Sequence, residues 1–195
     1  MENLPRIGVV DIGQGNIDAI CNITSECGYE IERIKNPSQN LELDWLILPG
    51  VGNFGAYASL LKQTKWHEFL KSEKKIRILA ICVGFQYLAN YSDESPEEPG
   101  LGVVDCSVKH LNQLKSDEKI PHVGWRQIPE LNGKFYFTHS YFMPDSLIVD
   151  SSVLLNFGSK KITVYLQKDN YYGVQFHPEK SGKSGINFFT SFFSG

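Results

Sequence analysis

Short apolar runs alternate with helical patterns through the first half of the chain. Residues 6–11, 30–34, 45–48 and 76–81 are apolar stretches that predict strands. The last stretch is almost continuously apolar, which is typical of a strand buried on both faces of a parallel sheet. The alternation therefore predicts parallel strands joined by right-handed helical crossovers.

Helical spacing separates these predicted strands. A first helix is expected to begin after Asn16, whose side chain is a good N-cap, and to end at Gly28. The apolar spacing predicts a second helix over about residues 54–70. Residues 85–89 predict the start of a third helix.

The second half changes to short strands separated by turn residues, and it ends in a helix marked by Ile186, Phe189 and Phe193. The strand candidates are residues 103–108, 123–128, 135–138, 153–157, 162–166 and 172–176. At 195 residues the chain has the length of one domain. We expect residues 1–195 to form a single α/β domain, in which helices flank a mostly parallel central sheet with an antiparallel or mixed C-terminal extension.

Composition removes several classes of function. The net charge of −3 argues against a dedicated nucleic-acid binder, which carries a basic excess. No apolar run approaches the roughly 18 residues that cross a membrane, and residues 1–5 lack the features of a secretory signal. The cysteines are scattered, without a Cys-x-x-Cys pair, so we expect reduced thiols in the cytoplasm. They are Cys21, Cys27, Cys82 and Cys106.

Cys82 stands where the buried strand at residues 76–81 turns into the next helix. Ala80 and Gly84 flank it two residues away, and small residues permit the sharp turn that exposes a nucleophile at the carboxyl edge of a sheet. The N–H groups at the start of the helix would stabilise a thiolate. The alternative is a buried structural cysteine.

His177 and Glu179 follow the last predicted strand, so they are expected at the same sheet edge as Cys82. A carboxylate that orients an imidazole beside a thiol makes the arrangement used for acyl transfer. The alternative is a surface turn around Pro178. Residues 49–52, with two glycines, also end a strand, and their backbone N–H groups would suit an oxyanion. A plain strand–helix turn has the same composition.

Two other signals are incomplete. Gly13 and Gly15 suggest a dinucleotide-binding loop, but Asp18 occupies the third glycine position. The histidines show neither the i, i+4 nor the short-loop spacing of metal ligands. They are His67, His110, His122, His139 and His177. We therefore expect neither a metal ion nor a cofactor.

Four motifs follow one another along nearly the whole chain. They are residues 48–56 (LPGVGNFGA), 81–86 (ICVGFQ), 137–141 (FTHSY) and 173–182 (GVQFHPEKSG). In combination they resemble the class I, or triad, glutamine amidotransferases. Residues 11–16 and 121–125 are similar to the glutaminase subunits of imidazole glycerol phosphate synthases, which belong to histidine biosynthesis.

The resemblance implies a reaction. Cys82 would attack the carboxamide of L-glutamine to give a γ-glutamyl thioester and ammonia. His177 would act as base and then as acid, and Glu179 would orient His177. The residues implied to form the oxyanion hole are Gly50, Val51 and Val83. Those implied to hold the glutamine are Gly52, Gln86, His139, Ser140 and Tyr141.

The resemblance also implies a partner. In this family the ammonia passes through a tunnel in a (β/α)8-barrel cyclase, with which the chain would form a heterodimer, and the cyclase makes imidazole glycerol phosphate. The positions that match cyclase-facing ones are Asn16, Trp125, Tyr136 and Lys180.

Some positions depart from the family pattern. Ala80 replaces a glycine, Ile12 stands where Tyr is frequent, and Arg126 stands where the family shows Asn. Because Ile12 and Arg126 lie in cyclase-facing stretches, one alternative is a paralogous glutaminase that supplies ammonia to another amidotransfer, such as surface-sugar modification. Another is a non-catalytic scaffold, which the presence of all three triad residues disfavours.

Overall fold

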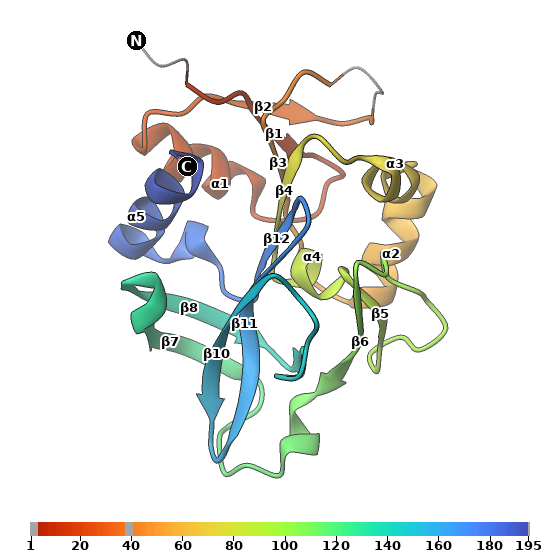
Figure 1. Ribbon diagram of the computed structural model, residues 1–195, viewed down its shortest axis with the longest axis vertical. Coiled ribbons are helices and arrows are strands. Elements are labelled where there is room, and N and C mark those ends of the chain that lie inside the picture. The colour runs from red at the N-terminus through yellow and green to blue at the C-terminus, as the bar shows by residue number, and fades with distance from the viewer. Residues whose placement is uncertain (1–3, 38–40, 195) are drawn as a thin grey trace.

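A seven-stranded sheet forms the centre of the computed structural model, which describes residues 4–37 and 41–194 (Figure 1). The strand order is β10-β11-β12-β4-β3-β1-β2. Five strands run parallel: β1 (Ile7–Val10), β2 (Ile31–Ile34), β3 (Trp45–Leu48), β4 (Arg77–Ile81) and β12 (Tyr171–Val174). The antiparallel strands β11 (Lys160–Lys168) and β10 (Ser151–Phe157) continue the sheet. The predicted α/β class and its mixed C-terminal extension are confirmed.

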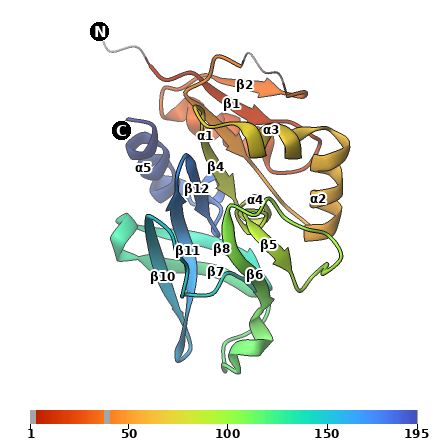
Figure 2. The ribbon, with the colours of Figure 1, turned by 45° about the vertical axis from the view of Figure 1, so that its right-hand side comes forward.

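Helices cover both faces of this sheet (Figures 1 and 2). One face carries α1 (Ile17–Glu26) and α5 (Gly182–Phe193), and the other carries α2 (Phe54–Gln63), α3 (Trp66–Ser72) and α4 (Val83–Gln86). The α5 side is an aromatic layer, in which Trp45 contacts Phe192 with ring centroids 4.7 Å apart. The predicted C-terminal helix is confirmed, with Phe189 and Phe193 buried.

The predicted single helix over residues 54–70 is wrong, because α2 ends at Gln63 and α3 begins at Trp66. Lys65 between them has φ 62°, which a continuous helix does not allow. The burial pattern explains the break. Leu61 and Trp66 are both buried, yet five residues of unbroken helix would turn them about 140° apart.

Two other sequence predictions fail. The start of a helix expected over residues 85–89 is the end of α4, and the chain then enters a strand, β5 (Ala89–Ser92). Three predicted strands leave the main sheet. β6 (Val104–His110) lies between β5 and β9 (Tyr141–Phe142), while β7 (His122–Ile128) pairs with β8 (Gly133–His139). Short 3-10 helices occupy Leu111–Leu114, Pro129–Leu131 and Pro178–Lys180.

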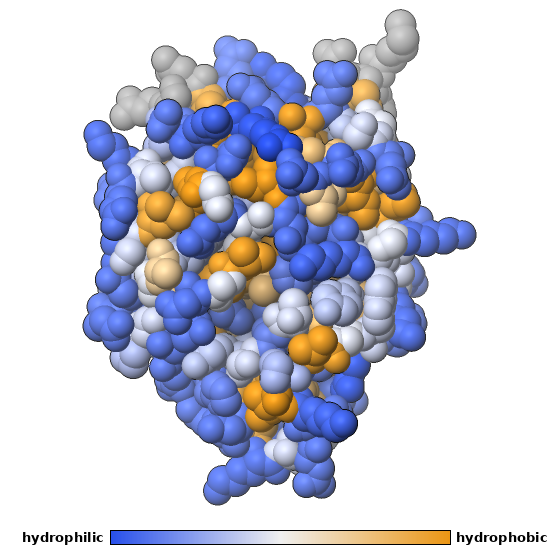
Figure 3. All heavy atoms as spheres, turned by 180° about the vertical axis from the view of Figure 1, so that it is seen from behind, coloured by the Kyte–Doolittle hydropathy of each residue, from blue (hydrophilic) through white to orange (hydrophobic). Residues whose placement is uncertain are grey.

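The parallel order brings several chain reversals to one edge of the sheet. The segments that follow β1, β3, β4 and β12 all leave from the carboxyl ends of neighbouring strands. Ligand sites of open α/β sheets form at this edge. Figure 3 shows hydrophilic atoms over most of the rear face, with apolar side chains in small patches.

Two further expectations concern a secretory signal and a membrane-spanning segment. Residues 1–3 of the segment tested for a secretory signal lie outside the described residues. No helix in the described part of the chain has the length and apolar character needed to cross a lipid bilayer.

Candidate active site

Cys82 occupies a sharp turn between β4 and α4, as the sequence predicts. Its φ of 55° and ψ of −108° lie outside the regions that side-chain-bearing residues usually adopt. The backbone fixes this turn on both sides, since Cys82 N–H donates to Val174 O (2.8 Å) and Gln86 N–H donates to Cys82 O (3.0 Å). The thiol is thus held at the carboxyl edge, and the side chain is buried.

His177 reaches the same edge from the segment after β12. Its N–H donates to Tyr136 O at 2.9 Å, which ties it to strand β8. The imidazole Nδ1 lies 2.7 Å from Glu179 Oε1, and both side chains are almost fully buried. Burial alone would lower the pKa of His177, but hydrogen bonds with Cys82 and Glu179 outweigh it and raise the pKa to about 10.

Asn16 contacts the same carboxylate oxygen of Glu179 as His177 does. Its Nδ2 donates to Glu179 Oε1 at 2.8 Å. Asn16 is the N-cap residue of α1, as predicted, but its side chain makes no capping bond to the helix. Loop residues on opposite ends of the sequence thereby fix Glu179, and through it the orientation of His177.

A cavity of about 390 Å³ opens between these segments. Its lining contains Cys82, His177 and eleven other residues. Those eleven are Val51, Gly52, Val83, Gln86, Glu94, Pro121, Thr138, His139, Ser140, Tyr141 and Lys180. The structure therefore brings together most of the residues that the sequence nominated. Glu94 and Thr138 were not nominated.

The loop after β3 packs tightly against the nucleophile turn. A Cβ placed on Gly50 would lie 2.3 Å from Gly84 N, and one placed on Gly84 would lie 2.4 Å from Leu48 O. Only glycine fits these two backbone approaches. The peptide between Gly50 and Val51 consequently runs directly beside the start of α4, where the Val83 N–H lies.

A chain of amides connects the cavity wall to the thiol. Gln86 Nε2 donates to Tyr141 O (3.1 Å) and to Gln175 Oε1 (3.0 Å), and Gln175 Nε2 lies 3.9 Å from Cys82 Sγ. Gln175 is fully buried. The sequence prediction assigned it no role, although its place two residues before His177 is the signal that would have found it.

A buried pair of histidines includes His139, which lines the cavity, and His122 behind it. His122 Nδ1 lies 2.9 Å from His139 Nε2, and His139 Nδ1 lies 2.7 Å from Tyr141 O. Because a carbonyl only accepts, His139 Nδ1 carries a proton and His122 Nδ1 donates to His139 Nε2. Burial lowers the pKa of His139 to about 3 and that of His122 to about 4.

The predicted partner-facing residues fall into two groups. Trp125 is 46% exposed and its ring meets Tyr136 edge-on at 5.8 Å, so these two form one aromatic surface on the β7–β8 hairpin. Lys180 is exposed and lines the cavity, whereas the Asn16 side chain donates to the buried Glu179 carboxylate. The Asn16 amide is thus engaged within the chain, while the Trp125 ring is exposed.

Arg126 has a local partner. Strand alternation turns it to the face opposite Trp125, where its guanidinium pairs with Glu118 at 3.2 Å and donates to Asn156 O at 2.8 Å. This departure from the family pattern is therefore accounted for within the chain. Ala80 is fully buried between β3 and β12, where its small side chain fits.

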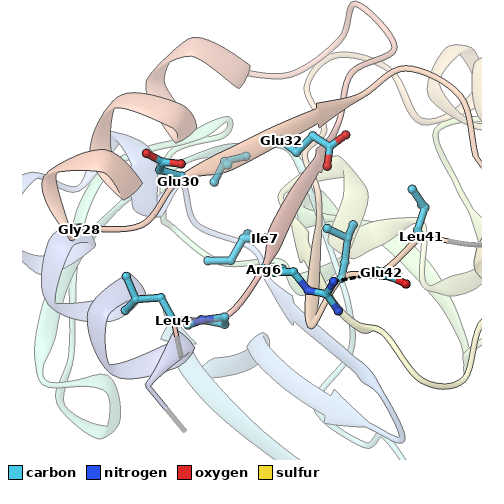
Figure 4. A pocket seen from close by; sticks show the side chains of 11 residues that line it. Leu4, Arg6, Ile7, Gly28, Glu30, Glu32, Leu41 and Glu42 are labelled. Atoms are coloured by element: carbon cyan, nitrogen blue, oxygen red, sulfur yellow. Dashed lines mark hydrogen bonds and ion pairs between the residues drawn. The ribbon is translucent and has the colours of Figure 1, made fainter. Parts of the chain in front are cut away.

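A larger hollow, of about 820 Å³, lies at the amino ends of β1 and β2 (Figure 4). Its polar groups include Glu30, Glu32 and an exposed Arg6–Glu42 pair at 2.8 Å. Its lining residues among those described include neither cysteine nor histidine. The smaller cavity around Cys82 is therefore the candidate active site.

Comparison with known proteins agrees with this geometry. The family model described as "Glutamine amidotransferase class-I" matches residues 8–194. The chain belongs to this family. The resemblance that the sequence motifs carry is thereby confirmed.

Two curated relatives and one solved structure illustrate the similarity of this amidotransferase. The imidazole glycerol phosphate synthase subunit HisH of Prochlorococcus marinus is 38% identical over 197 residues, covering 93% of this chain and 94% of that protein. The imidazole glycerol phosphate synthase hisHF of Emericella nidulans is 30% identical, covering 98% of this chain and 38% of that protein. A crystal structure titled as a glutamine amidotransferase has the same fold, with a TM-score of 0.69 at 17% identity over 97% of this chain and 99% of that one.

Proposed function

We propose that the chain hydrolyses L-glutamine to glutamate and ammonia and delivers the ammonia to a (β/α)8-barrel cyclase that makes imidazole glycerol phosphate in histidine biosynthesis. The observation that carries the proposal is the meeting of Cys82 and His177 in one cavity, with Glu179 2.7 Å behind His177. The relatives named as imidazole glycerol phosphate synthase proteins support the pathway. Residues 1–195 act as a single glutaminase domain in the cytoplasm.

The reaction follows from the order of the three side chains. His177 holds the proton of the Cys82 thiol, as its raised pKa favours, and Cys82 Sγ forms a bond to the side-chain carbonyl carbon of glutamine. The C–N bond then breaks, and His177 returns the proton to the leaving nitrogen, which departs as ammonia. Water then gives a proton to His177 and attacks the thioester carbonyl. The C–S bond breaks, glutamate leaves, and Cys82 and His177 again share one proton. Glu179 accepts from Nδ1 and keeps Nε2 directed at the reacting atoms.

Backbone donors stabilise the oxyanion that forms at each attack. The Val83 N–H lies next to the nucleophile, and the Gly50–Val51 peptide runs beside it because Gly50 packs on Gly84. Such donors are worth about 10²–10³-fold in kcat each.

A carboxylate on the cavity wall matches one end of an amino acid. Glu94 supplies this carboxylate for the α-ammonium group. The remaining lining groups, which hold the body of the substrate, are Gly52, Gln86, His139, Ser140 and Tyr141. Because Gln86 Nε2 already has two internal acceptors, its Oε1 is the atom that faces the substrate.

The aromatic surface on the β7–β8 hairpin is the proposed contact with the cyclase. Trp125 and its neighbour Val123 are 46% and 55% exposed, and Tyr136 packs against Trp125. Aromatic residues of this kind are enriched at protein interfaces. Lys180, at the cavity rim, and Asn16 complete the contact. The long hisHF relative, of which this chain covers 38%, is consistent with a second functional unit beside the glutaminase.

Glutamine hydrolysis with a purified cyclase barrel tests the proposal. The chain should hydrolyse glutamine slowly alone and faster when the barrel and its ribotide acceptor are present. The barrel with ammonium salt, without this chain, is the control for the acceptor half of the reaction. Hydrolysis that no cyclase of the histidine pathway stimulates would contradict the proposed partner, and the absence of any hydrolysis would contradict the activity.

A further inference from the structure

Tyr57 joins the first turn of α2 to the loop that precedes it. Its hydroxyl donates to the carbonyl oxygen of Pro49 at 2.6 Å, and its side chain is fully buried. Pro49 directly precedes the Gly50–Val51 peptide. Tyr57 itself does not line the cavity and therefore has no direct contact with the substrate.

The surroundings keep this hydroxyl in place as a donor. The Tyr57 ring meets Tyr87 edge-on, with centroids 5.8 Å apart, and Tyr87 in turn contacts Phe54 at 6.0 Å. Burial raises the pKa of Tyr57 well above its usual value, so the hydroxyl keeps its proton at neutral pH.

The bond to Pro49 controls one end of the oxyanion loop. A peptide group is planar, so fixing the Pro49 carbonyl also fixes the Gly50 N–H and Cα. The Gly50 Cα is the point that packs on Gly84 at the start of α4. At the other end, Asn53 Oδ1 accepts from Ala56 N at 3.1 Å and anchors the loop to the same helix. The first turn of α2 therefore holds both ends of the loop.

We propose that Tyr57 is a positioning residue, which sets the Gly50–Val51 peptide for oxyanion stabilisation by holding the carbonyl of Pro49. The inference rests on the proposed glutaminase function and adds a residue that touches neither substrate nor triad. Its effect belongs to the transition state, because the loop meets the carbonyl oxygen most strongly when that oxygen carries charge.

Tyr57→Phe removes only the donor, and Tyr171→Phe is its matched control. Tyr171 is also buried and also donates to a backbone carbonyl, that of Leu70, but it lies at the amino end of β12, away from the cavity. In the complex with the cyclase, Tyr57→Phe should lower kcat for glutamine about tenfold with KM unchanged. Tyr171→Phe should keep kcat within about twofold while losing similar thermal stability.

Alkylation of Cys82 by iodoacetamide separates positioning from general damage. This displacement at carbon needs the thiolate but forms no oxyanion, so Tyr57→Phe should react at the wild-type rate. The bond itself is visible by NMR. With ¹³C-carbonyl proline and ¹⁵N-glycine, the Pro49–Gly50 and Pro99–Gly100 pairs give two signals. Only the first should shift in Tyr57→Phe.

Three results would overturn the inference: an unchanged or increased kcat in Tyr57→Phe, an equal loss of kcat in Tyr171→Phe, or a parallel loss of alkylation. If Tyr57→Phe does not fold, fluorinated tyrosines at position 57 retain the hydroxyl and vary its donor strength. The Pro49 carbonyl signal and kcat should then change together, and a shift with constant kcat would reject the proposal. If wild-type complex shows no glutamine hydrolysis, the proposed function fails instead.

Discussion

His177 and His139 line the same cavity and are both buried, yet their pKa values move in opposite directions. That of His177 rises to about 10, and that of His139 falls to about 3. Their exposed fractions are 1% and 6%, so burial does not distinguish them.

The partners of the two rings explain the difference. His177 meets the Glu179 carboxylate and the Cys82 sulfur, and negative charge on these acceptors favours the imidazolium. His139 meets a carbonyl and the ring of His122, and the second ring has no charge to offer. A histidine at this cavity therefore has a raised pKa only where a carboxylate contacts it. His122 and His139 form a neutral pair, and His139 donates to the Tyr141 carbonyl.

The largest effect is expected at the thiol that distinguishes the His177 side. Cys82→Ala should lower glutamine hydrolysis by at least about 10³-fold, because no thioester forms. Ammonium-dependent synthesis by the complex should survive. A diazo-ketone analogue of glutamine should label Cys82 and spare the other cysteines. Near wild-type hydrolysis by Cys82→Ala would place the chemistry elsewhere.

Replacing the acid should make His177 resemble His139. Glu179→Gln should lower the pKa of His177 and reduce kcat by about 10²-fold, less than His177→Ala, because an orienting residue is often the least costly member of a triad. The pH–rate profile and ¹⁵N NMR of the imidazole measure the two changes. An equal or greater loss at Glu179 would assign it a direct role with substrate.

The His122–His139 pair and His177 should change the stability of the fold in opposite directions as pH varies. The pKa values of His122 and His139 lie below the unfolded value of about 6.5, so the unfolded state binds more protons and stability falls as pH drops from about 6.5 toward 3. The loss at pH 4 is on the order of 3 kcal/mol for each histidine. His177 contributes stability below pH 6.5 that is lost as pH rises through about 10.

Urea unfolding between pH 4 and pH 7 measures this prediction. His122→Phe should flatten the acid side of the profile, since it removes one titrating ring and keeps the stacking on Phe137, whose ring lies 4.9 Å away. If the free energy of unfolding falls equally steeply toward pH 4 in wild type and in His122→Phe, the His122–His139 pair is not the cause of the acid destabilisation.

The smallest effect is expected at the rim. Lys180→Ala should weaken stimulation by the cyclase several-fold and leave iodoacetamide labelling of Cys82 unchanged, because the lysine is exposed and outside the buried triad. Titration of the variant with the barrel gives the affinity and the maximal rate separately. If the variant is fully stimulated and binds the barrel with wild-type affinity, Lys180 is a solvated surface charge and makes no contact with the cyclase.

Much of this arrangement could be predicted from the sequence, because local patterns specify it. The apolar run before Cys82 and the small residues around it predict both the strand and the turn. The order of the parallel strands then predicts that His177 ends on the same edge. Motif spacing also located the loop at Gly50, since glycine is required there by a close backbone approach.

What the sequence missed depends on contacts between distant segments. His122 and His139 are 17 residues apart and meet only because β7 and β8 pair in register. The sequence predicts Asn16 as a helix cap, but its side-chain amide donates instead to Glu179, which follows β12 near the other end of the sequence. The five-residue spacing between Leu61 and Trp66 indicates that one straight helix cannot bury both side chains. Only the packing of the folded chain shows that both are buried and that the helix therefore breaks.

The position of β12 has a consequence for the timing of activity during synthesis. This strand is made near the end of the chain but inserts between β11 and β4, beside the strand that carries the thiol. The bond from Cys82 N–H to Val174 O and the arrival of His177 both await it. A ribosome-bound chain lacking these residues holds its cysteine at an unfinished sheet edge, unable to split glutamine. The site is therefore complete only after β12 and the segment with His177 and Glu179 have been made and have joined the sheet.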